Sequence, residues 1–375
     1  MNTATLPDIE IGGRRLGAGQ RPWVVAEMSA NHHGSLDEAL RIVRAAAAHG
    51  ADAIKLQTYT PGTLTLDSER AEFFIDDPAS AWHGRRLWDL YQEAHTPWEW
   101  HAPLFEAARA AGLACISSAF DTSSLEFLVS LGVDAIKIAS FELVHLPLIE
   151  AAARTGTPLL LATGMASMEE IDEAWRAIGT RHSARSVLLK CTSAYPASED
   201  DANVLALPQL RQRYGCHVGL SDHTLRPFAA YAATAHGAVL IEKHLTLSRA
   251  QGGVDAAFSI EPQELRELAE GAALVWRSLG RAQYGPQAAE STSLRERPSV
   301  YVVRPMLKGE RFTADNLRIV RPGNGLAPRH WHALLGARCS RDIAGAAPLS
   351  WELVDGGEPD HAAVGQHRHA AGTRA

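Results

Sequence analysis

The stretch "VGLSDHT" at residues 218–224 begins as a buried β-strand and ends in polar residues, because an apolar run is followed at once by a Ser-Asp-His triplet. A second stretch, "AVLIEKHLT" at residues 238–246, repeats the pattern and ends in a Glu-Lys-His triplet. Polar clusters at the C-terminal ends of successive buried strands are typical of a (β/α)8 barrel, which builds its active site there. We therefore expect His223 and His244 to lie at the functional end of such a barrel.

Runs of this kind recur along the chain and alternate with helical patterns, which indicates βα units and a parallel sheet. There are eight runs, at residues 23–29, 53–57, 113–118, 135–140, 158–164, 186–192, 216–223 and 238–244. Capping boxes are predicted for two of the helices, at Ser35 with Glu38 and at Ser167 with Glu170. An open, doubly wound sheet is the competing fold, but no GxGxxG follows the first run. The sequence thus predicts an α/β fold with a closed (β/α)8 TIM barrel.

Composition limits the partners of the protein. The 375 residues carry a net charge of -7 and no long basic run, which argues against nucleic acid or a membrane surface as the main partner. Four cysteines lie far apart with no CxxC spacing, and neither a signal segment nor a membrane span is apparent. We expect a cytoplasmic protein whose partners are small molecules or a second copy of itself.

Composition also changes along the chain. We expect a barrel domain over residues 1–285, a linker over 286–298, a small β-rich domain over 299–355 and a disordered tail over 356–375. Within the barrel, the connection at residues 58–112 is too long for a simple loop and is rich in tryptophan. It is expected to hold helices of its own and to act as a lid or a partner contact, with plain aromatic packing as the alternative.

The two histidines are the candidate metal ligands. His223 and His244 end neighbouring strands of a closed barrel, so their rings can converge on one ion, with Asp222 and Glu242 beside them. A histidine at a barrel rim can also be a hydrogen-bonded structural residue. Two nitrogen ligands alone would leave an open site, which suits Mn²⁺ or Mg²⁺ acting as a Lewis acid better than a closed Zn²⁺ site.

Two lysines at other strand ends predict an anionic ligand. Lys55 and Lys137 would be costly to bury without an anionic partner, such as a phosphate or carboxylate. The alternative is an ion pair with Glu27 or Glu142. Glu27 itself is a candidate acid/base or sugar-binding group, or a partner of Lys55. The other polar residues expected at this height are Gln57, Ser118, Ser140, Ser193 and Ser221.

Eight motifs together resemble the sialic acid synthase family. They are "AEMSANHHGSLDEAL", "GADAIKLQTYT", "AIKIASFE", "ATGMAS", "KCTSAYP", "GLSDHT", "IEKHLTL" and "RPGNGL", and the resemblance runs from about residue 10 to 355. The motifs "AEMS", "TPWEWH", "CTSAYP" and "SRAQGGVDAAFS" favour the pseudaminic acid branch of the family. The resemblance implies a TIM barrel joined to an antifreeze-like (SAF) domain in a domain-swapped homodimer. It also implies condensation of phosphoenolpyruvate with an acylamino sugar, which releases phosphate by C–O cleavage.

The resemblance assigns roles position by position. It implies that His223 and His244 bind the metal, with Glu242 close by. It places phosphoenolpyruvate on Lys55, Gln57, Ser118, Lys137, Ser140, Ser193 and Ser221. Around the sugar and the reacting water it places Glu27, Tyr195 and Asp222. Arg321 resembles the arginine that reaches from the small domain into the partner's barrel to hold the N-acyl group. Which group activates the water stays open between Glu27, Glu242 and the metal.

Three motifs depart from the family pattern. "SSAF", with Ser118 and Ala119, stands where the family has "STPF", and Ala162 stands in "ATGM" where the family has "STGM". "RERPS" at residues 295–299, at the entrance to the small domain, departs as well. The loss of one hydroxyl donor at Ala162 should weaken phosphoenolpyruvate binding by roughly 1 kcal/mol, which does not change the assignment.

Two other classes of function stay open from the residues. A carbohydrate-binding protein with a non-catalytic barrel is one, but retention of both histidines and both lysines argues against it. A metal-dependent sugar isomerase is the other, but it would bring more carboxylate ligands and would not need paired lysines.

Overall fold

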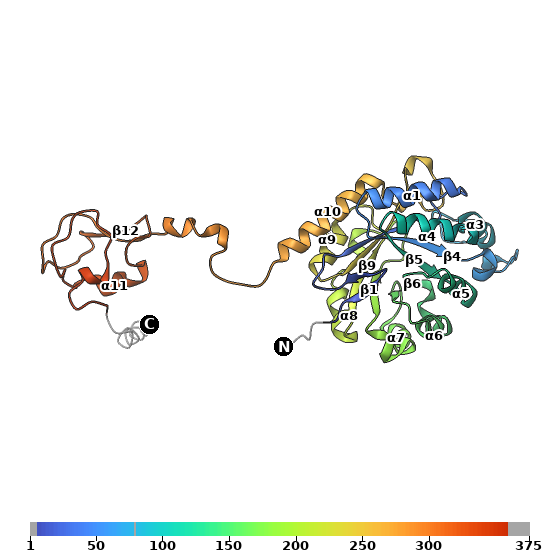
Figure 1. Ribbon diagram of the computed structural model, residues 1–375, viewed down its shortest axis with the longest axis horizontal. Coiled ribbons are helices and arrows are strands. Elements are labelled where there is room, and N and C mark those ends of the chain that lie inside the picture. Colours follow the sequence, from blue (N-terminus) through green and yellow to red (C-terminus); the bar gives the residue numbers. More distant parts are fainter. Residues whose placement is uncertain (1–5, 79, 359–375) are drawn as a thin grey trace, which may run out of the picture. The chain divides into compact units, whose positions relative to one another are not determined.

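The computed structural model describes residues 6–78 and 80–358, and the chain divides into two compact units on either side of Gly280 and Arg281. Figure 1 shows the ribbon of both units. Most of the predicted disordered tail lies outside the described residues.

The first unit is a closed barrel of eight parallel strands in the order β10-β3-β4-β5-β6-β7-β8-β9. The strands are β3 (Trp23–Glu27), β4 (Ala53–Thr58), β5 (Ala114–Ala119), β6 (Ala135–Ile138), β7 (Leu159–Ala162), β8 (Ser186–Cys191), β9 (His217–Asp222) and β10 (Leu240–His244). The predicted TIM barrel is confirmed, and the doubly wound alternative is wrong because β10 pairs with β3 and closes the sheet.

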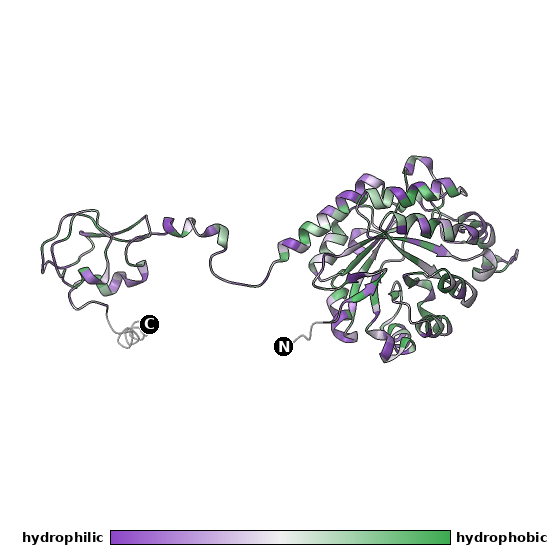
Figure 2. Ribbon diagram, in the orientation of Figure 1, coloured by the Kyte–Doolittle hydropathy of each residue, from purple (hydrophilic) through white to green (hydrophobic). Residues whose placement is uncertain are grey.

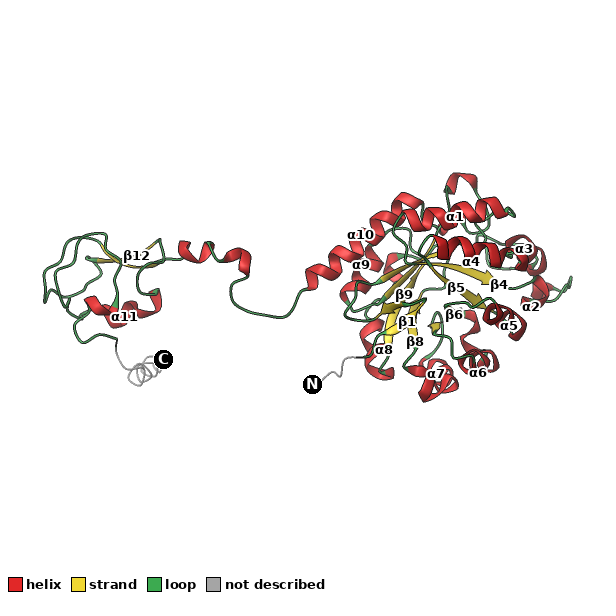
Figure 3. Ribbon diagram, in the orientation of Figure 1, coloured by secondary structure: helices red, strands yellow, loops and turns green. Residues whose placement is uncertain are grey.

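Helices surround the strands, as Figure 3 shows. They are α1 (Leu36–Ala48), α4 (His101–Ala110), α5 (Thr122–Ser130), α6 (Leu146–Arg154), α7 (Met168–Ser183), α8 (Ala206–Tyr214), α9 (Phe228–Ala235) and α10 (Pro262–Leu279). Every side chain of the barrel strands is buried except that of Gln57, which is half-buried. Strands covered on both sides read as continuous apolar runs, which is the pattern of the sequence (Figure 2).

The helix caps agree only partly with the sequence. Ser167 and Glu170 form the reciprocal capping box at the start of α7. Ser35 accepts a hydrogen bond from the backbone N–H of Glu38, but the Glu38 carboxylate pairs with Arg41, so the second half of that box is absent. The helix α7 is interrupted at Gly179, whose φ of 71° and ψ of 158° are not helical.

The two ends of the barrel differ in polarity. At the N-terminal end of the strands, a hairpin of β1 (Ile9–Ile11) and β2 (Arg14–Leu16) contributes to an apolar cluster inside the barrel. That cluster includes Trp23, Leu160 and Leu240. The charged residues therefore gather towards the opposite end of the interior, where the strands finish.

The long connection at residues 58–112 contains α2 (Pro61–Leu64) and α3 (Leu87–Ala94) as well as α4. Packing explains two of its tryptophans, because Trp98 stacks on Phe127 at 4.7 Å and Trp100 contacts His32 edge-on. Trp82 is different, since its indole N–H donates to the carbonyl of Val254 and its ring lies 5.8 Å from that of Tyr195. The connection therefore reaches the end of the barrel that carries the polar residues.

The second unit has a small core of its own. Strands β11 (Ser299–Val302) and β12 (Leu317–Val320) pair in antiparallel fashion, and α11 (Trp331–Leu334) is a single turn. Val300, Phe312 and Leu317 are fully or almost fully buried in this core. This is the small β-rich domain that the sequence predicts. Across the described parts of both units, no helix combines the length and apolar character needed to span a bilayer.

Candidate active site

Strand register brings the predicted residues together inside the barrel. In the parallel pairing, Glu27 is aligned with Lys55 on one side and with His244 on the other. Ser118 is aligned with Gln57 and with Lys137, and Ser221 is aligned with Cys191 and with Glu242. Aligned residues on neighbouring strands point to the same face, so these side chains form a polar layer near the C-terminal ends of the strands.

Two buried lysines and two buried glutamates form the centre of this layer. The Lys55 ammonium pairs with the carboxylate of Glu27, and the Lys137 Nζ lies 2.7 Å from Glu242 Oε1. Lys55 Nζ lies 3.8 Å from the same Glu242 oxygen. For Lys55, the pairing with Glu27 is the alternative that the sequence left open. Lys137 pairs with Glu242, which the sequence analysis did not consider.

The lysines set the ionisation of the two glutamates differently. Burial opposes ionisation of Glu242, but the ammoniums of Lys137 and Lys55 outweigh burial and hold its pKa below the usual range. Burial dominates at Glu27 and raises the pKa of that carboxyl despite Lys55. One carboxyl is therefore held as a carboxylate, and the other is biased towards accepting a proton, as in acid/base pairs.

Hydroxyl groups surround the lysines. Ser118 accepts a hydrogen bond from Lys55 Nζ at 3.2 Å, and Ser221 donates to Glu242 Oε1 at 2.8 Å. Ser140 and Ser193 lie beyond the ends of β6 and β8, and their Oγ atoms are 2.8 Å apart. Gln57 donates to Ser29 Oγ at 2.9 Å. The structure thus brings the predicted phosphoenolpyruvate-binding residues of the barrel to one end of it.

The two histidines lie beside this cluster, with ring centroids 5.3 Å apart. His223 Nδ1 is 2.8 Å from the carbonyl oxygen of Thr192, which orients the ring and leaves Nε2 for another contact. Burial, together with the charges of His223 and Lys55, lowers the pKa of His244 well below its usual value, so this imidazole is neutral. Tyr195 packs on His223 at 4.4 Å, and Phe258 packs on His244 at 5.0 Å.

The donor set fits an open metal site with two protein ligands. His244 Nδ1 and Glu242 Oε2 are buried without a hydrogen-bond partner among the described residues, which is costly unless a ligand completes the site. In the same part of the chain, no group of three or more His, Cys, Asp or Glu side chains is arranged to hold an ion. Water and substrate oxygens would have to supply the remaining ligands, as expected for an open site.

The structure does not bring Asp222 to the other predicted residues. Side chains alternate along β9, so Ser221 faces the interior and Asp222 faces the surrounding helices. The Asp222 carboxylate is 2.7 Å from Lys243 Nζ and also accepts from the backbone N–H of Thr224. This buried pair lies outside the barrel interior and fixes the turn that carries His223. Side chains on a strand point alternately to its two faces, so the position of Asp222 next to Ser221 would have predicted this outward orientation from the sequence.

Arg321 belongs to the second unit, where it follows β12 and is exposed. It makes no side-chain hydrogen bond or ion pair within the described residues. Its predicted contact with a sugar therefore stays a prediction.

Two residues that were not among the predicted site residues also line this end of the barrel. Asp255 is buried in the loop after β10 and accepts hydrogen bonds from Ser29 Oγ and from the backbone N–H of Ala30. Gly164, after β7, has a φ of 47°, and a Cβ there would lie 2.8 Å from Ser193 Oγ. Both residues stand in βα loops of the catalytic face, which is the signal that could have found them.

Glu142 is a further carboxyl, half-buried and close enough to Lys137 to be affected by its charge. Burial raises its pKa to about 7, and Lys137 lowers it less strongly. Its Oε2 has no hydrogen-bond partner in the part of the chain that the structure describes. Glu142 was considered only as a lysine partner, and the structure pairs both lysines elsewhere.

Comparison with known proteins agrees with this geometry. Residues 42–284 match the NeuB family, and residues 297–355 match the SAF domain. The chain is 39% identical to a pseudaminic acid synthase of Helicobacter pylori, over 90% of this chain and 98% of the relative. It is 32% identical to an N,N'-diacetyllegionaminic acid synthase of Legionella pneumophila, over 90% and 96% of the two chains.

A solved structure of a related enzyme is similar to this chain in sequence and in fold. The N-acetylneuraminic acid (sialic acid) synthetase of Leptospira borgpetersenii, crystallised with citrate, is 32% identical. The match has a TM-score of 0.68 and covers 77% of this chain and 95% of that one.

A TIM barrel with paired lysines and glutamates at its C-terminal end, followed by a SAF domain, defines the class of protein. The chain belongs to the NeuB family. It is an enzyme of the phosphoenolpyruvate-dependent nonulosonic acid synthases.

Proposed function

We propose that the protein is a pseudaminic acid synthase. It joins phosphoenolpyruvate to 2,4-diacetamido-2,4,6-trideoxy-L-altrose, with water, and yields pseudaminic acid and phosphate. The observation that carries the chemistry is the buried layer in which Lys55 and Lys137 are paired with Glu27 and Glu242. The branch rests on the motifs of the sequence and on the higher identity to pseudaminic acid synthases (39%) than to the Legionella legionaminic acid synthase (32%).

The lysines bind the phosphate and carboxylate of phosphoenolpyruvate. An anionic substrate competes with the two glutamates for the ammonium groups, and this competition releases a carboxylate next to the reacting carbons. Ser118, Ser140 and Ser193 then donate hydroxyl hydrogen bonds to the phosphate. Charge-assisted bonds of this kind fix both the position and the orientation of the substrate.

The electron pair of the C2–C3 double bond of phosphoenolpyruvate forms the bond from C3 to the aldehyde carbon of the open-chain sugar, and the aldehyde oxygen takes up a proton and becomes a hydroxyl. Water adds at C2 and gives one proton to Glu27, whose pKa is raised by burial, which balances the proton taken up by the sugar. The C2–O bond then breaks, phosphate leaves with the bridging oxygen and the second proton of the water, and the keto group forms at C2. A divalent ion such as Mn²⁺ or Mg²⁺, held by His223 and His244, would supply Lewis-acid polarisation of the sugar carbonyl. Tyr195 and Phe258 form an apolar wall that orients the two imidazoles.

We also propose that the enzyme acts as a domain-swapped homodimer, in which Arg321 holds the N-acyl group of the sugar in the partner's barrel. Arg321 is exposed and has no side-chain partner within the described residues, so its guanidinium is free to bind a carbonyl oxygen. The planar fork of arginine suits this contact better than the ammonium of lysine. A cytoplasmic location stays a prediction from the sequence.

Phosphate release in the presence of phosphoenolpyruvate and each candidate sugar tests the proposed function. The altro-configured diacetamido sugar should be turned over much faster than N-acetylmannosamine or the gluco- and manno-configured diacetamido sugars. Phosphoenolpyruvate labelled with ¹⁸O at the bridging position should deliver the label to phosphate, because the C–O bond breaks. Preference for another sugar would show that the enzyme is a legionaminic acid or N-acetylneuraminic acid synthase instead. Absence of turnover with every sugar would favour a carbohydrate-binding role.

A further inference from the structure

A cavity of about 650 Å³ lies far from the candidate active site along the barrel. Its lining comes from the end of α6, from the second half of α7 and from the connections that precede β7 and β8. These segments meet at the N-terminal ends of the strands, whereas the lysines and histidines lie at the C-terminal ends. A cavity of this volume is in the range of small-molecule sites.

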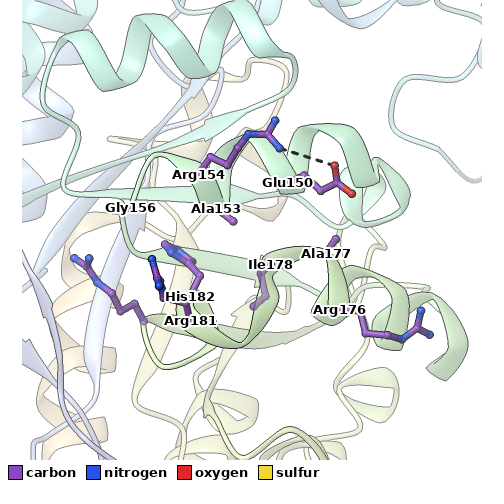
Figure 4. A pocket seen from close by; sticks show the side chains of 10 residues that line it. Glu150, Ala153, Arg154, Gly156, Arg176, Ala177, Ile178, Arg181 and His182 are labelled. Atoms are coloured by element: carbon purple, nitrogen blue, oxygen red, sulfur yellow. Dashed lines mark ion pairs between the residues drawn. The ribbon is translucent and has the colours of Figure 1, made fainter.

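The cavity is strongly cationic although the chain as a whole carries a net charge of -7. Four arginines line it, namely Arg154, Arg176, Arg181 and Arg185, against the single carboxylate of Glu150. Figure 4 labels Arg154, Arg176 and Arg181 among the lining side chains, with Arg154 directed towards Glu150. Their N–O separation is 4.0 Å, a weak ion pair between exposed groups.

The other three arginines are exposed and have no close polar partner within the described residues. Arg176, Arg181 and Arg185 form no side-chain hydrogen bond or ion pair there. Asp172, the acidic group one turn before Arg176, is bound by Arg213 and by the hydroxyl of Tyr214, and the charge of Arg176 contributes less to lowering its pKa. A helix C-terminus favours a cation and accounts for Arg181, but not for Arg176 in mid-helix or Arg185 after the helix.

A buried histidine also borders the cavity. His182 is one of its lining residues and is only 7% exposed, so its ring signals would report a ligand bound there. The break at Gly179 divides α7, so Arg176 on one side and Arg181 with His182 on the other border the same space.

We propose that this cavity binds a phosphorylated small molecule of sugar-phosphate or nucleotide size. Guanidinium groups bind phosphate oxygens in a bidentate manner, and several of them around one concave site are typical of phosphate recognition. The volume exceeds what inorganic phosphate needs, so an organic group attached to the phosphate fills the remainder. The site is separate from the catalytic lysines, and the inference does not depend on the proposed function.

Calorimetric titration of the full-length protein tests the inference, with inorganic phosphate, pyrophosphate, sugar phosphates and nucleoside mono- and diphosphates as probes. The Lys137→Met variant serves as the background, because it removes a catalytic anion-binding group and leaves the cavity unchanged. At least one organic phosphate should bind this variant more tightly than inorganic phosphate does. Adding Arg176→Gln, Arg181→Gln and Arg185→Gln should weaken that binding at least about tenfold, the effect of losing one charge-assisted hydrogen bond or more.

A matched triple variant controls for the change in net charge. Arg44→Gln, Arg277→Gln and Arg281→Gln remove three exposed arginines that lie outside the cavity. Equal weakening in both triples would overturn the proposal, because binding would then follow net charge alone. Absence of binding by every phosphate, or binding of an oligonucleotide alone, would overturn it as well. In NMR spectra, the imidazole signals of His182 should shift with the bound organic phosphate, and unchanged signals would contradict its place in the site.

Discussion

Lys137 on β6 and Glu242 on β10 lie on opposite sides of the barrel, and their side chains meet in its interior at 2.7 Å. Each is 3% exposed. The pair therefore spans the site, and each buried charge has a counter-charge while no substrate is present. A substrate phosphate or carboxylate can replace Glu242 at Lys137 without leaving a buried charge alone.

Lys137→Met should lower kcat/KM for phosphoenolpyruvate by about 100-fold or more, since a charge-assisted bond to the substrate is lost. It should also destabilise the fold by about 3–5 kcal/mol, because Glu242 is left buried with only the more distant Lys55. The double variant Lys137→Met with Glu242→Leu should regain much of the stability but none of the activity. Urea unfolding and steady-state kinetics measure the two effects. If the double variant is as unstable as Lys137→Met alone, the loss of stability does not come from leaving the Glu242 carboxylate unpaired.

His223→Ala and His244→Ala should each abolish turnover and leave the circular dichroism spectrum unchanged. Each should also weaken the binding of Mn²⁺, which paramagnetic resonance measures without any turnover. His83→Ala is the matched control, because His83 is exposed and lies in the long connection after β4. Full activity after chelator treatment, or undiminished Mn²⁺ binding in both variants, would refute the metal site.

Gly164→Ala should raise the KM for phosphoenolpyruvate strongly, because the added methyl would collide with Ser140 and Ser193 and displace their hydroxyls. Gly112→Ala is the control. Gly112 also has a positive φ, of 79°, but a Cβ there would meet open space. Both variants should lose roughly 1 kcal/mol of stability from backbone strain. Gly164→Ala should lose more because of the collision with Ser140, and only Gly164→Ala should lose substrate affinity. The same KM for phosphoenolpyruvate in both variants would show that the close approach of Gly164 to Ser140 and Ser193 does not affect substrate binding.

His32 and His101 should make the fold sensitive to acid. Burial lowers the pKa of each to about 4, so both are neutral in the folded protein, whereas an unfolded histidine titrates near 6.5. Between these values the unfolded chain binds more protons, so stability should be complete above about pH 6.5 and fall as the pH approaches 4.

His101→Gln tests this dependence. It should reduce the slope of unfolding free energy against pH by up to about 1.4 kcal/mol per pH unit within that window. Glutamine retains a hydrogen-bonding group near Thr58, which contacts His101 Nε2 at 2.8 Å. Urea midpoints at pH 5.0 and 7.5 measure the effect. If the slope of unfolding free energy against pH is the same in the variant, His101 does not contribute to the acid sensitivity of the fold.

Arg321→Ala should raise the KM for the sugar far more than the KM for phosphoenolpyruvate. A mixture of the Arg321→Ala and His223→Ala chains should regain partial activity, because one site of each mixed dimer combines an intact barrel with an intact arginine. Native mass spectrometry of differently tagged chains verifies that subunits exchange. If mixed dimers form and remain inactive, Arg321 does not act on the partner's barrel.

The sequence by itself determined the fold and most of the residues that the structure brings together at the candidate site. Apolar runs that end in polar residues are a local signal, and eight of them placed Lys55, Lys137, His223 and His244 at strand ends before any contact was known. Side-chain alternation with a period of two is equally local, and it would have separated the outward Asp222 from the inward Ser221.

Only the tertiary structure decided which charges meet. The partner of Lys137 is more than a hundred positions away in the chain, on the strand opposite in the ring, and closure of the barrel sets that distance. The contact of Trp82 with Tyr195 and the approach of Asp255 to Ser29 likewise depend on how long loops fold back over the strand ends. Local patterns fix where a side chain stands on its own strand, but pairing across a barrel depends on strand order, stagger and tilt, which arise only when the sheet closes.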